Sequence, residues 1–537
     1  MPPHIQHRHP VFPTVIQSQW PRRSNNNNNC QLTTPPGIPH RSSPESRLSR
    51  PLWQPQTRTR PFRSIPLARA PPPPITDAPH HDNSSSPATT HRPRKTPRDF
   101  DASRYSTRLI ALKLAYVGSA YGGFEYHGND TALPTVEEIL FSALLKSRLV
   151  SSQPGHPQPT SPEAWPGDEA VEYSKCGRTD RGVSAFGQVV GVRVRSNRPL
   201  PRSMDTNEEG KSRGKGEHEE PKPFDDVADE MPYTQILNRL LPPTIRILAW
   251  AHNPPDGFSA RFNCRARHYR YFFTDPMLSP TNSGGTLDIV AMQTAAQYFL
   301  GSHDFRNFCK LDPGKQIDNF SRDILESSIE VLPGVGDGDT ATTATTYYFN
   351  LKGTAFLWHQ VRHMMAILFL VGQGLEKPEV VRDMLDMSLF PTKPMYEMAD
   401  DRPLVLWDCE FPNAVLQWLV ADDGELRGAL ADTTWMGWHE KKIDEILAGQ
   451  LVGLVRRQLE ENEKSPVPVK KKNAAKPGHV LILGSGEALL RGKYVPIQER
   501  KRMRPAAEIN KCFIERKGDW RERRELKRKK KEAKGSE

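Results

Sequence analysis

The stretch KCGRTDRGVSAFG, residues 175–187, decides how the rest of the chain is interpreted. It places two glycines, two arginines and the carboxylate of Asp180 within seven consecutive residues. Glycine permits backbone conformations that other residues resist, so the stretch predicts a tight loop with Asp180 between Arg178 and Arg181. Taken alone, this loop is more typical of a structural turn held by an Asp–Arg pair than of a catalytic site.

Periodic patterns on both sides of this loop predict strands and a helix. Over residues 190–195, valines alternate with glycine and arginine, which predicts a strand with one apolar and one cationic face. Residues 109–114 predict a strand buried on at least one side, and a glycine-rich aromatic loop follows at 116–128. Thr135 and Glu138 have the spacing of a capping box, so an amphipathic helix should begin there.

Similar elements recur on both sides of Tyr269. The patterns predict helices at 233–241, 287–300 and 358–371, and strands at 245–251 and 347–352. This order favours an α+β fold of two similar halves, each a mainly antiparallel sheet with helices on one face.

Composition divides the chain into four segments. Residues 1–100 form a tail rich in proline and arginine that we expect to be disordered. Residues 101–270 are the first half of the folded domain, with an acidic, disordered insertion at 201–230, and residues 271–412 are the second half. Residues 413–537 are a helical extension and a basic tail.

Charge is unevenly distributed over the chain, whose net charge is +11. Residues 1–97 hold 13 Lys+Arg against 3 Asp+Glu, and residues 491–537 hold 18 against 8. The intervening residues are therefore net acidic. If this middle part binds nucleic acid, it must do so through a local cationic patch, with the tails adding sequence-independent attraction to phosphates.

Cysteine spacing and apolar runs exclude several classes of protein. The six cysteines show no C-x-x-C spacing, which argues against a zinc site or a disulfide framework and fits a reducing compartment. No apolar run reaches the length of a membrane span, so no membrane association is expected. The N-terminus is rich in Arg and Ser, as organelle transit peptides are, but its prolines break any amphipathic helix.

Three further motifs have competing interpretations. Residues 261–273 interleave arginines and aromatics, which favours an RNA-contacting strand over a strand with a solvated arginine face. His359 and His363 have the spacing of a zinc pair, but without a third ligand nearby they are better explained as core or RNA-facing histidines. Residues 481–486 begin like a dinucleotide-binding loop but lack its third glycine, so a turn is expected.

Several of these motifs together resemble the TruA family of tRNA pseudouridine synthases. GRTDRGVSA (177–185) is similar to that family's catalytic motif, and ARF (260–262), YRY (269–271) and AFLWHQVR (355–362) match further segments in the expected order. The resemblance covers roughly residues 105–412. Other segments, including HDFRN (303–307), are similar to the eukaryotic branch, which modifies positions 38 and 39 in the tRNA anticodon arm.

The resemblance implies isomerisation of uridine to pseudouridine in a central RNA-binding cleft. Asp180 would be the essential carboxylate, as a nucleophile or as a base at the sugar. Arg362 would pair with it and keep it ionised. Arg178 would hold the space left by the flipped base, and Tyr269 would stack on the uracil. Leu404 would help to wall the pocket, with Leu406 as the alternative.

The resemblance also implies partners and location. It implies a tRNA substrate recognised at the anticodon stem-loop, a homodimer, and no metal or organic cofactor. The basic run at 527–531 is typical of a solvated tail or a nuclear localisation signal. We expect a nuclear and cytoplasmic protein, with a mitochondrial fraction as a minor alternative. Two other functions stay open: a non-catalytic RNA-binding or RNA-chaperone protein with the same fold, and a structural protein that acts through its basic tails.

Overall fold

The computed structural model describes eleven parts of the chain, separated by gaps. They are residues 101, 104–126, 132–150, 171–200, 223–277, 286–333, 344–412, 415–420, 426–464, 479–491 and 493–518. The predicted tail at 1–100 and the loop around 334–343 lie outside these residues, as does the far C-terminus.

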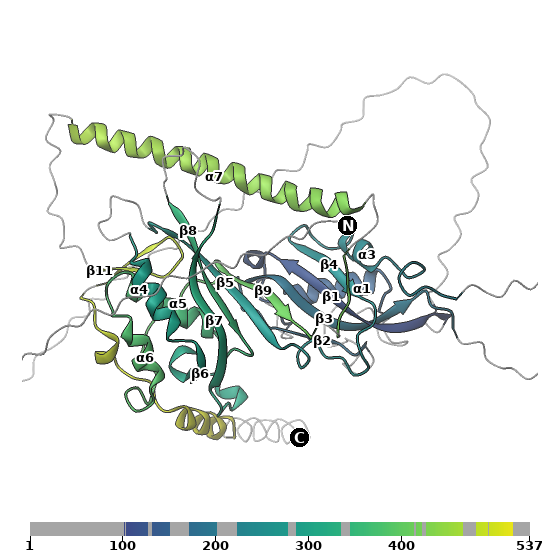
Figure 1. Cartoon of the computed structure of the whole chain (residues 1–537), viewed down its shortest axis with the longest axis horizontal. Coiled ribbons are helices and arrows are strands. Elements are labelled where there is room, and N and C mark those ends of the chain that lie inside the picture. Colours follow the sequence, from purple (N-terminus) through teal and green to yellow (C-terminus); the bar gives the residue numbers. More distant parts are fainter. Residues whose placement is uncertain are drawn as a thin grey trace, which may run out of the picture. The chain divides into compact units, whose positions relative to one another are not determined.

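One large mixed sheet dominates the described residues (Figure 1). Its ten strands are β1 (Ser106–Tyr116), β2 (Ser174–Lys175), β3 (Ser184–Ser196), β4 (Ile245–Ala251), β5 (Ala266–Asp275), β6 (Gly301–Asp304), β7 (Ser321–Val331), β8 (Thr345–Gly353), β9 (Leu404–Glu410) and β10 (Trp418–Val420). They run in the order β10-β4-β1-β3-β9-β5-β8-β7-β6, with β2 added beside β3. Among these pairs only β3 and β9 run parallel, through Ser184–Val405 and Ala185–Leu406.

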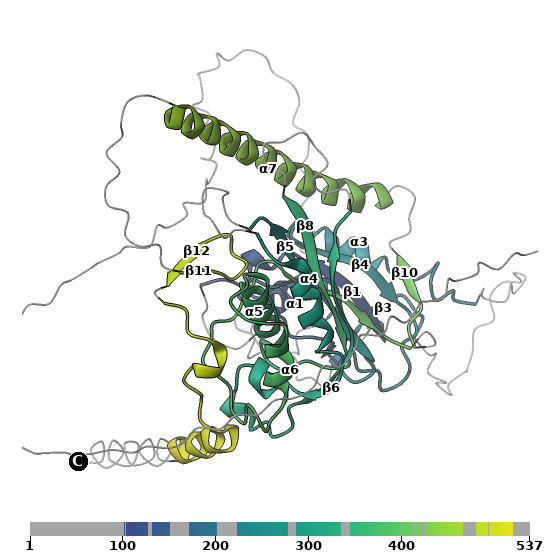
Figure 2. The same ribbon diagram turned by 60° about the vertical axis from the view of Figure 1, so that its left-hand side comes forward.

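Helices pack against this sheet and close two apolar clusters. They are α1 (Val136–Lys146), α3 (Tyr233–Asn238), α4 (Ile289–Gln297), α5 (Gln360–Gly372) and α6 (Glu379–Leu385). Figure 1 shows α4, α5 and α6 on the side of β7 and β8, whereas α1 and α3 lie by β1 and β4, and Figure 2 shows α4, α5 and α6 close together from a second direction. One cluster joins α1 and α3 to β1, β3 and β4, and the other joins α4, α5 and α6 to β5 and β8. The mixed α+β class expected from the sequence is therefore confirmed.

The C-terminal part adds a long helix and a hairpin. They are α7 (Leu426–Lys464) and the antiparallel pair β11 (His479–Ile482) and β12 (Ala488–Arg491). The turn predicted at 481–486 is confirmed, because residues 483–487 follow β11 and join it to β12. None of the helices in the described part of the chain combines the length and the apolarity needed to cross a bilayer.

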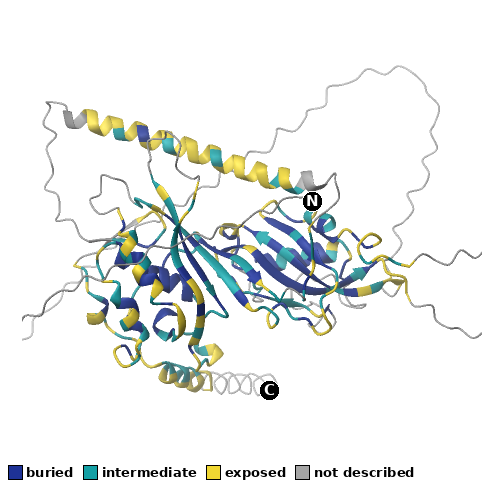
Figure 3. Ribbon diagram, viewed as in Figure 1, coloured by how far each residue is buried: buried dark blue, intermediate teal, exposed yellow. Residues whose placement is uncertain are grey.

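Local sequence signals account for several element boundaries. Thr135 caps α1 through a complete capping box with Glu138, as its spacing predicts. The helix α5, predicted to begin at Trp358, begins at Gln360 because His359 has a left-handed backbone with φ of 59°. Every residue of α5 is buried, which makes it the central helix of its cluster (Figure 3).

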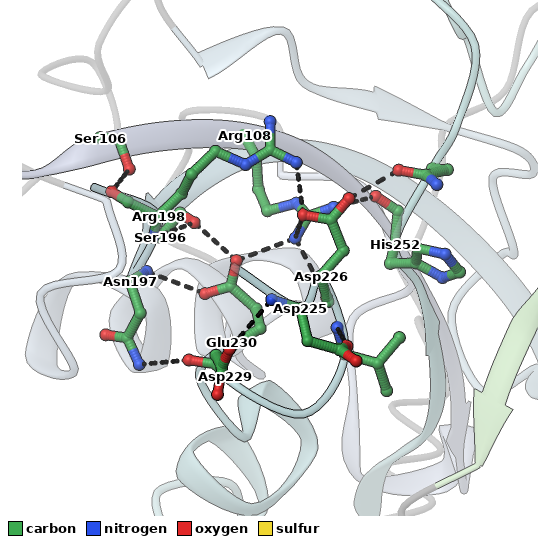
Figure 4. Close-up of polar contacts among 12 residues, drawn as sticks. Ser106, Arg108, Ser196, Asn197, Arg198, Asp225, Asp226, Asp229, Glu230 and His252 are labelled. Atoms are coloured by element: carbon green, nitrogen blue, oxygen red, sulfur yellow. Dashed lines mark hydrogen bonds and ion pairs between the residues drawn. The ribbon is translucent and has the colours of Figure 1, made fainter. Parts of the chain in front are cut away.

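The predicted disordered insertion at 201–230 is too long at its C-terminal end. Residues 223–230 are described and folded, because their acidic side chains meet arginines of the sheet (Figure 4). Glu230 Oε2 lies 2.9 Å from Arg108 Nη1, and its side chain is fully buried. Hydrogen bonds from Ser196 and from the Asn197 amide lower the pKa of Glu230 despite the opposing effect of burial. This buried ion pair fastens the segment to β1 and β3.

Candidate active site

The Asp180 loop, residues 176–183, is joined by hydrogen bonds to the end of β1 and to the glycine-rich aromatic loop that follows it. The hydroxyl of Tyr116 lies 2.7 Å from Thr179 Oγ1, and the Phe124 amide donates to the Thr179 carbonyl over 3.1 Å. The Gly118 amide donates to Ser184 Oγ over 3.0 Å. These bonds fix the backbone on both sides of Asp180, so the carboxylate has a defined position.

Gly118 is required by the close approach of these two loops. A Cβ at this position would lie 2.1 Å from the Val183 carbonyl oxygen, which is backbone and cannot rotate away. We expect Gly118→Ala to cost about 1–3 kcal/mol of stability through overpacking and to lower the Tm by at least about 2 °C. Gly449→Ala, in α7, is the control because nothing lies within 4 Å of its added Cβ. Equal melting temperatures of Gly118→Ala and wild type in calorimetry would contradict this account.

Asp180 is contacted by two side chains that directly precede α5. Trp358 Nε1 donates to Asp180 Oδ1 over 3.1 Å, and His359 Nε2 lies 3.4 Å from Asp180 Oδ2. The Asp180 side chain retains 26% of its exposure. A left-handed backbone such as that of His359 costs about 1–3 kcal/mol and persists only where its surroundings hold it. The carboxylate is thus held in place but still reachable from solvent.

The predicted ion pair between Arg362 and Asp180 is wrong in this structure. Arg362 Nη2 lies 3.6 Å from Asp401 Oδ2, and its Nε donates to the Ala399 carbonyl over 2.8 Å. Arg362 is the third residue of α5, and its side chain donates to the segment before β9. Only 9% of that side chain is exposed.

Asp401 connects Arg362 to the Asp180 loop. A Cβ on Gly182 would lie 2.4 Å from Asp401 Oδ1, so the carboxylate packs directly against this loop. Burial raises the pKa of Asp401, and the positive charge of Arg362 opposes the rise. Arg362 therefore acts on the loop through Asp401 in the absence of RNA.

Arg178 lies at the rim of the site. Its Nε is 3.0 Å from Glu125 Oε1, and 48% of its side chain is exposed. Glu125 also lies 2.9 Å from Lys175 Nζ, so it is shared between two cations. An exposed pair of this kind contributes at most about 1 kcal/mol. Arg178 can therefore leave Glu125 when a nucleotide arrives.

Tyr269 and Leu406 face each other across the β5–β9 pair. The Tyr269 ring packs edge-on against Phe356, with centroids 5.0 Å apart. Burial raises the pKa of the Tyr269 phenol, and the charge of Asp180 adds to the rise, so the phenol is neutral and near that carboxylate. Leu406 is fully buried, and a Cβ on Gly177 would lie 3.2 Å from its Cδ2.

Leu404 lies two residues earlier, at the start of β9. It pairs with Tyr271 and packs in the cluster around α5. The amide of Leu404 donates to the Asp401 carbonyl over 3.1 Å. Leu406, the alternative for the pocket wall, lies beside Gly177 of the Asp180 loop and opposite Tyr269, whereas Leu404 shares its cluster with Val183 of the same loop.

The strand of interleaved arginines and aromatics is only partly as predicted. Tyr271 and Phe273 are buried in the core, so they cannot stack on a base. The Arg270 guanidinium lies 4.0 Å from the Trp407 ring centroid and 4.6 Å from that of Tyr348. Phe262, just before β5, is 80% exposed. Phe262, at the N-terminal end of this segment, is thus the aromatic residue most available to a ligand.

Sequence reasoning missed Trp358, His359 and Asp401 as contacts of the site. The sequence predicts the same role for His359 and His363, as core or RNA-facing histidines and not as a zinc pair. His363 is buried, its Nδ1 lies 3.0 Å from the His359 carbonyl, and burial lowers its pKa well below the usual range. No signal in the sequence distinguishes the two histidines, because only the left-handed turn at His359 directs it to Asp180.

Two lysines lie close to the ring of Trp358. Lys310 Nζ lies 4.5 Å from the Trp358 ring centroid, and Lys315 Nζ lies 5.8 Å from it. Nearby, burial lowers the pKa of Lys393 to about 8. A local positive environment is thus present beside Asp180, as the acidic net charge of the middle of the chain requires for nucleic-acid binding.

Comparison with known proteins places this geometry in a family. A family model described as tRNA pseudouridine synthase matches residues 295–412. The Saccharomyces cerevisiae tRNA pseudouridine(38/39) synthase is 37% identical over 445 residues, which is 81% of this chain and 84% of the yeast protein. The human protein of the same name is 43% identical over 333 residues, 62% of this chain and 61% of its own length.

A more distant relative is similar over a shorter span. The Methanosarcina mazei tRNA pseudouridine synthase A is 29% identical over 287 residues, which is 52% of this chain and 77% of that protein. The match to the yeast protein alone establishes the family. The chain belongs to the tRNA pseudouridine synthase family.

Proposed function

We propose that this protein isomerises uridine to pseudouridine at positions 38 and 39 in the anticodon arm of tRNA. The observation that carries the proposal is the placement of Asp180. Its carboxylate is fixed by Trp358 and His359, beside Tyr269, on the loop that resembles the family's catalytic motif. The name shared by the yeast and human relatives supports the choice of positions. No contact favours the non-catalytic alternative.

The reaction is an isomerisation, so bonds and electrons balance without an external reagent. The C1′–N1 glycosidic bond of uridine breaks, the base rotates, and a C1′–C5 bond forms between the same base and sugar. The hydrogen on C5 leaves as a proton and N1 gains a proton, so the product is an isomer of the substrate. Asp180 acts at the sugar as nucleophile or base, and both roles need the ionised carboxylate. Trp358 donates a hydrogen bond to that form, which stabilises it in a partly desolvated position, and His359 Nε2 lies 3.4 Å from it.

The resemblance to the family supplies roles for the other site residues. Tyr269 stacks on the uracil, and Leu404 and Leu406 wall the pocket on the β9 side. Arg178 leaves Glu125 to fill the space vacated by the flipped nucleotide, since base chemistry in a paired stem requires extrusion of the base. Arg362 stabilises the Asp180 loop through Asp401, and the Arg362 side chain is largely shielded from solvent.

We propose further that two similar halves of the sheet form a central cleft for the anticodon stem-loop. The two apolar clusters and the single parallel junction between β3 and β9 support this division. A homodimer, and residence in nucleus and cytoplasm with a minor mitochondrial fraction, complete the proposal. The basic run at 527–531 supports the nuclear part. Light scattering of the purified protein and microscopy of a fluorescent fusion test these points.

Trp358→Phe tests the hydrogen bond to Asp180. The substitution keeps an aromatic ring for Lys310 but removes the N–H donor. A hydrogen bond to a charged group is worth about 1.5–3 kcal/mol, so we expect kcat to fall roughly 10- to 100-fold. Trp418→Phe, in β10, is the matched control and should keep wild-type rates. Unchanged kcat in single-turnover assays of Trp358→Phe would show that the bond is not catalytically important.

Purified protein and defined tRNA transcripts test the proposed activity. A transcript with uridine at 38 and 39 should gain pseudouridine at both positions. Transcripts with cytidine at one of the two should gain it only at the remaining uridine. Modification of other positions at equal rate would refute the assignment to 38 and 39, and no modification of any transcript would refute the activity.

A further inference from the structure

Three cysteines that are far apart in the sequence meet directly behind the Asp180 loop. The Sγ atoms of Cys176, Cys264 and Cys409 all lie within 4.8 Å of one another. Cys176 directly precedes Gly177, Cys264 lies two residues before β5, and Cys409 is the penultimate residue of β9. The spacing of the cysteines in the sequence argues against a zinc site, but spacing does not show ligands that the fold brings together from distant segments.

The backbone at each cysteine is fixed by hydrogen bonds. The Cys176 amide donates to the Val189 carbonyl over 2.9 Å, and Cys409 is paired with Arg267 in the β5–β9 register. The Cys264 thiol donates to the Ala266 carbonyl over 3.2 Å. Cys176 and Cys409 are buried, whereas Cys264 is partly exposed. The three sulfurs are therefore pre-arranged, and one edge of the cluster is reachable from solvent.

Packing alone is the simpler explanation for buried thiols, which often behave as small apolar groups. The neighbouring charge argues against it. Arg267 donates to the carbonyls of Thr354, Cys176 and Arg261, and no carboxylate lies within ion-pair distance of it among the described residues. A largely buried guanidinium without a carboxylate requires another anion.

The cysteines can supply that anion. Arg267 Nη2 donates to the Cys176 carbonyl over 3.1 Å, and Cys409 lies opposite Arg267 in the β5–β9 register, so the guanidinium lies beside the cluster. A cation that displaced the thiol protons would be held by three thiolates, and cysteine thiolates select soft or borderline metal ions.

Charge balance selects among these metals. Three thiolates and a divalent ion leave one negative charge, which Arg267 neutralises. A monovalent copper ion would leave one negative charge without a partner in a buried site, which is costly. Zinc also matches the reducing compartment predicted from the lack of disulfides, since it has no redox chemistry of its own.

We propose that Cys176, Cys264 and Cys409 bind one zinc ion, with a water molecule as the fourth ligand on the Cys264 side. The ion would join the start of the Asp180 loop to β5 and β9, the strands that carry Tyr269 and Leu406. Its role is structural, because it holds the loop and touches no reacting atom. The proposed zinc site does not depend on which uridine of the tRNA the protein modifies.

Metal content of the purified full-length protein tests the proposal. By elemental mass spectrometry we expect one zinc per chain in the wild type and in Cys309→Ser, a buried cysteine outside the cluster. Cys264→Ser should lose most of the metal. Zinc-free wild-type protein that cannot take up added zinc, or a full complement of zinc in Cys264→Ser, would overturn the site.

A variant that unfolds would also lose zinc, so a second measurement uses the wild type alone. After removal of the metal with a chelator, added cobalt should give the near-ultraviolet absorption of cobalt–thiolate bonds, and added zinc should abolish it. Metal removal should lower the Tm by at least about 2 °C. The proposal would be overturned if no cobalt–thiolate band appeared. It would also be overturned if the cysteines of the metal-free protein formed a disulfide and added cobalt did not prevent this.

Discussion

Asp180→Asn should abolish pseudouridine formation while leaving the fold and tRNA affinity nearly unchanged. Asparagine has the same shape and can still accept from Trp358 Nε1, so the loop keeps its contact. The amide is neither a nucleophile nor a base, and removal of an essential catalytic group costs about 10³-fold or more in rate. Single-turnover measurement of pseudouridine formation and a binding assay with the same tRNA separate the effect on rate from the effect on affinity.

The matched control for this variant is Asp256→Asn, an exposed aspartate in the turn between β4 and β5. It removes the same charge from the surface and should keep wild-type rates. Undiminished activity of Asp180→Asn would end the catalytic assignment. An equal loss of tRNA binding would show instead that Asp180 organises the RNA interface and that its effect on rate is indirect.

Arg362→Ala should also lose nearly all activity, at least about 10²-fold in kcat, with the Kd for tRNA largely retained. The reason is burial. The guanidinium is 9% exposed and donates to the Ala399 carbonyl, so it is poorly placed to reach a tRNA phosphate. Its removal takes away the ion-pair partner of Asp401 next to the Asp180 loop. Arg362→Lys should recover only part of the rate, because an ammonium cannot reproduce the two contacts.

Asp401→Asn distinguishes two ways in which Arg362 could act. Arg362 contacts Asp401 in this structure, so we expect Asp401→Asn to lose activity to about the same extent as Arg362→Ala. A loss of less than about tenfold in Asp401→Asn would show that Arg362 does not act through Asp401. A parallel collapse of tRNA binding in Arg362→Ala would identify it as a phosphate contact.

Local signals in the sequence were sufficient for much of the fold. The capping box at Thr135 predicted the start of α1, and alternating apolar residues predicted β4 over its full length. These features depend on neighbours within one or two turns of chain, which a sequence displays directly. The position of Asp180 on a tight glycine-containing loop is also a feature that depends on near neighbours in the chain.

Contacts between distant segments were the ones that sequence reasoning missed. Trp358 and His359 reach Asp180 only because a left-handed residue starts α5 and because α5 and the loop share one end of the sheet. Arg362 points to Asp401 for the same reason. The cysteine cluster depends on the β5–β9 register and on the end of β2. None of these arrangements has a signal in spacing or periodicity.

Pseudouridine mapping across all tRNAs in cells that lack this protein tests the central claim most directly. The account predicts loss of pseudouridine at positions 38 and 39, with other positions unaffected. Re-expression of the wild-type chain should restore both positions, and Asp180→Asn should restore neither. Retention of pseudouridine at 38 and 39 in the deletion strain, or equal restoration by wild type and Asp180→Asn, would contradict it.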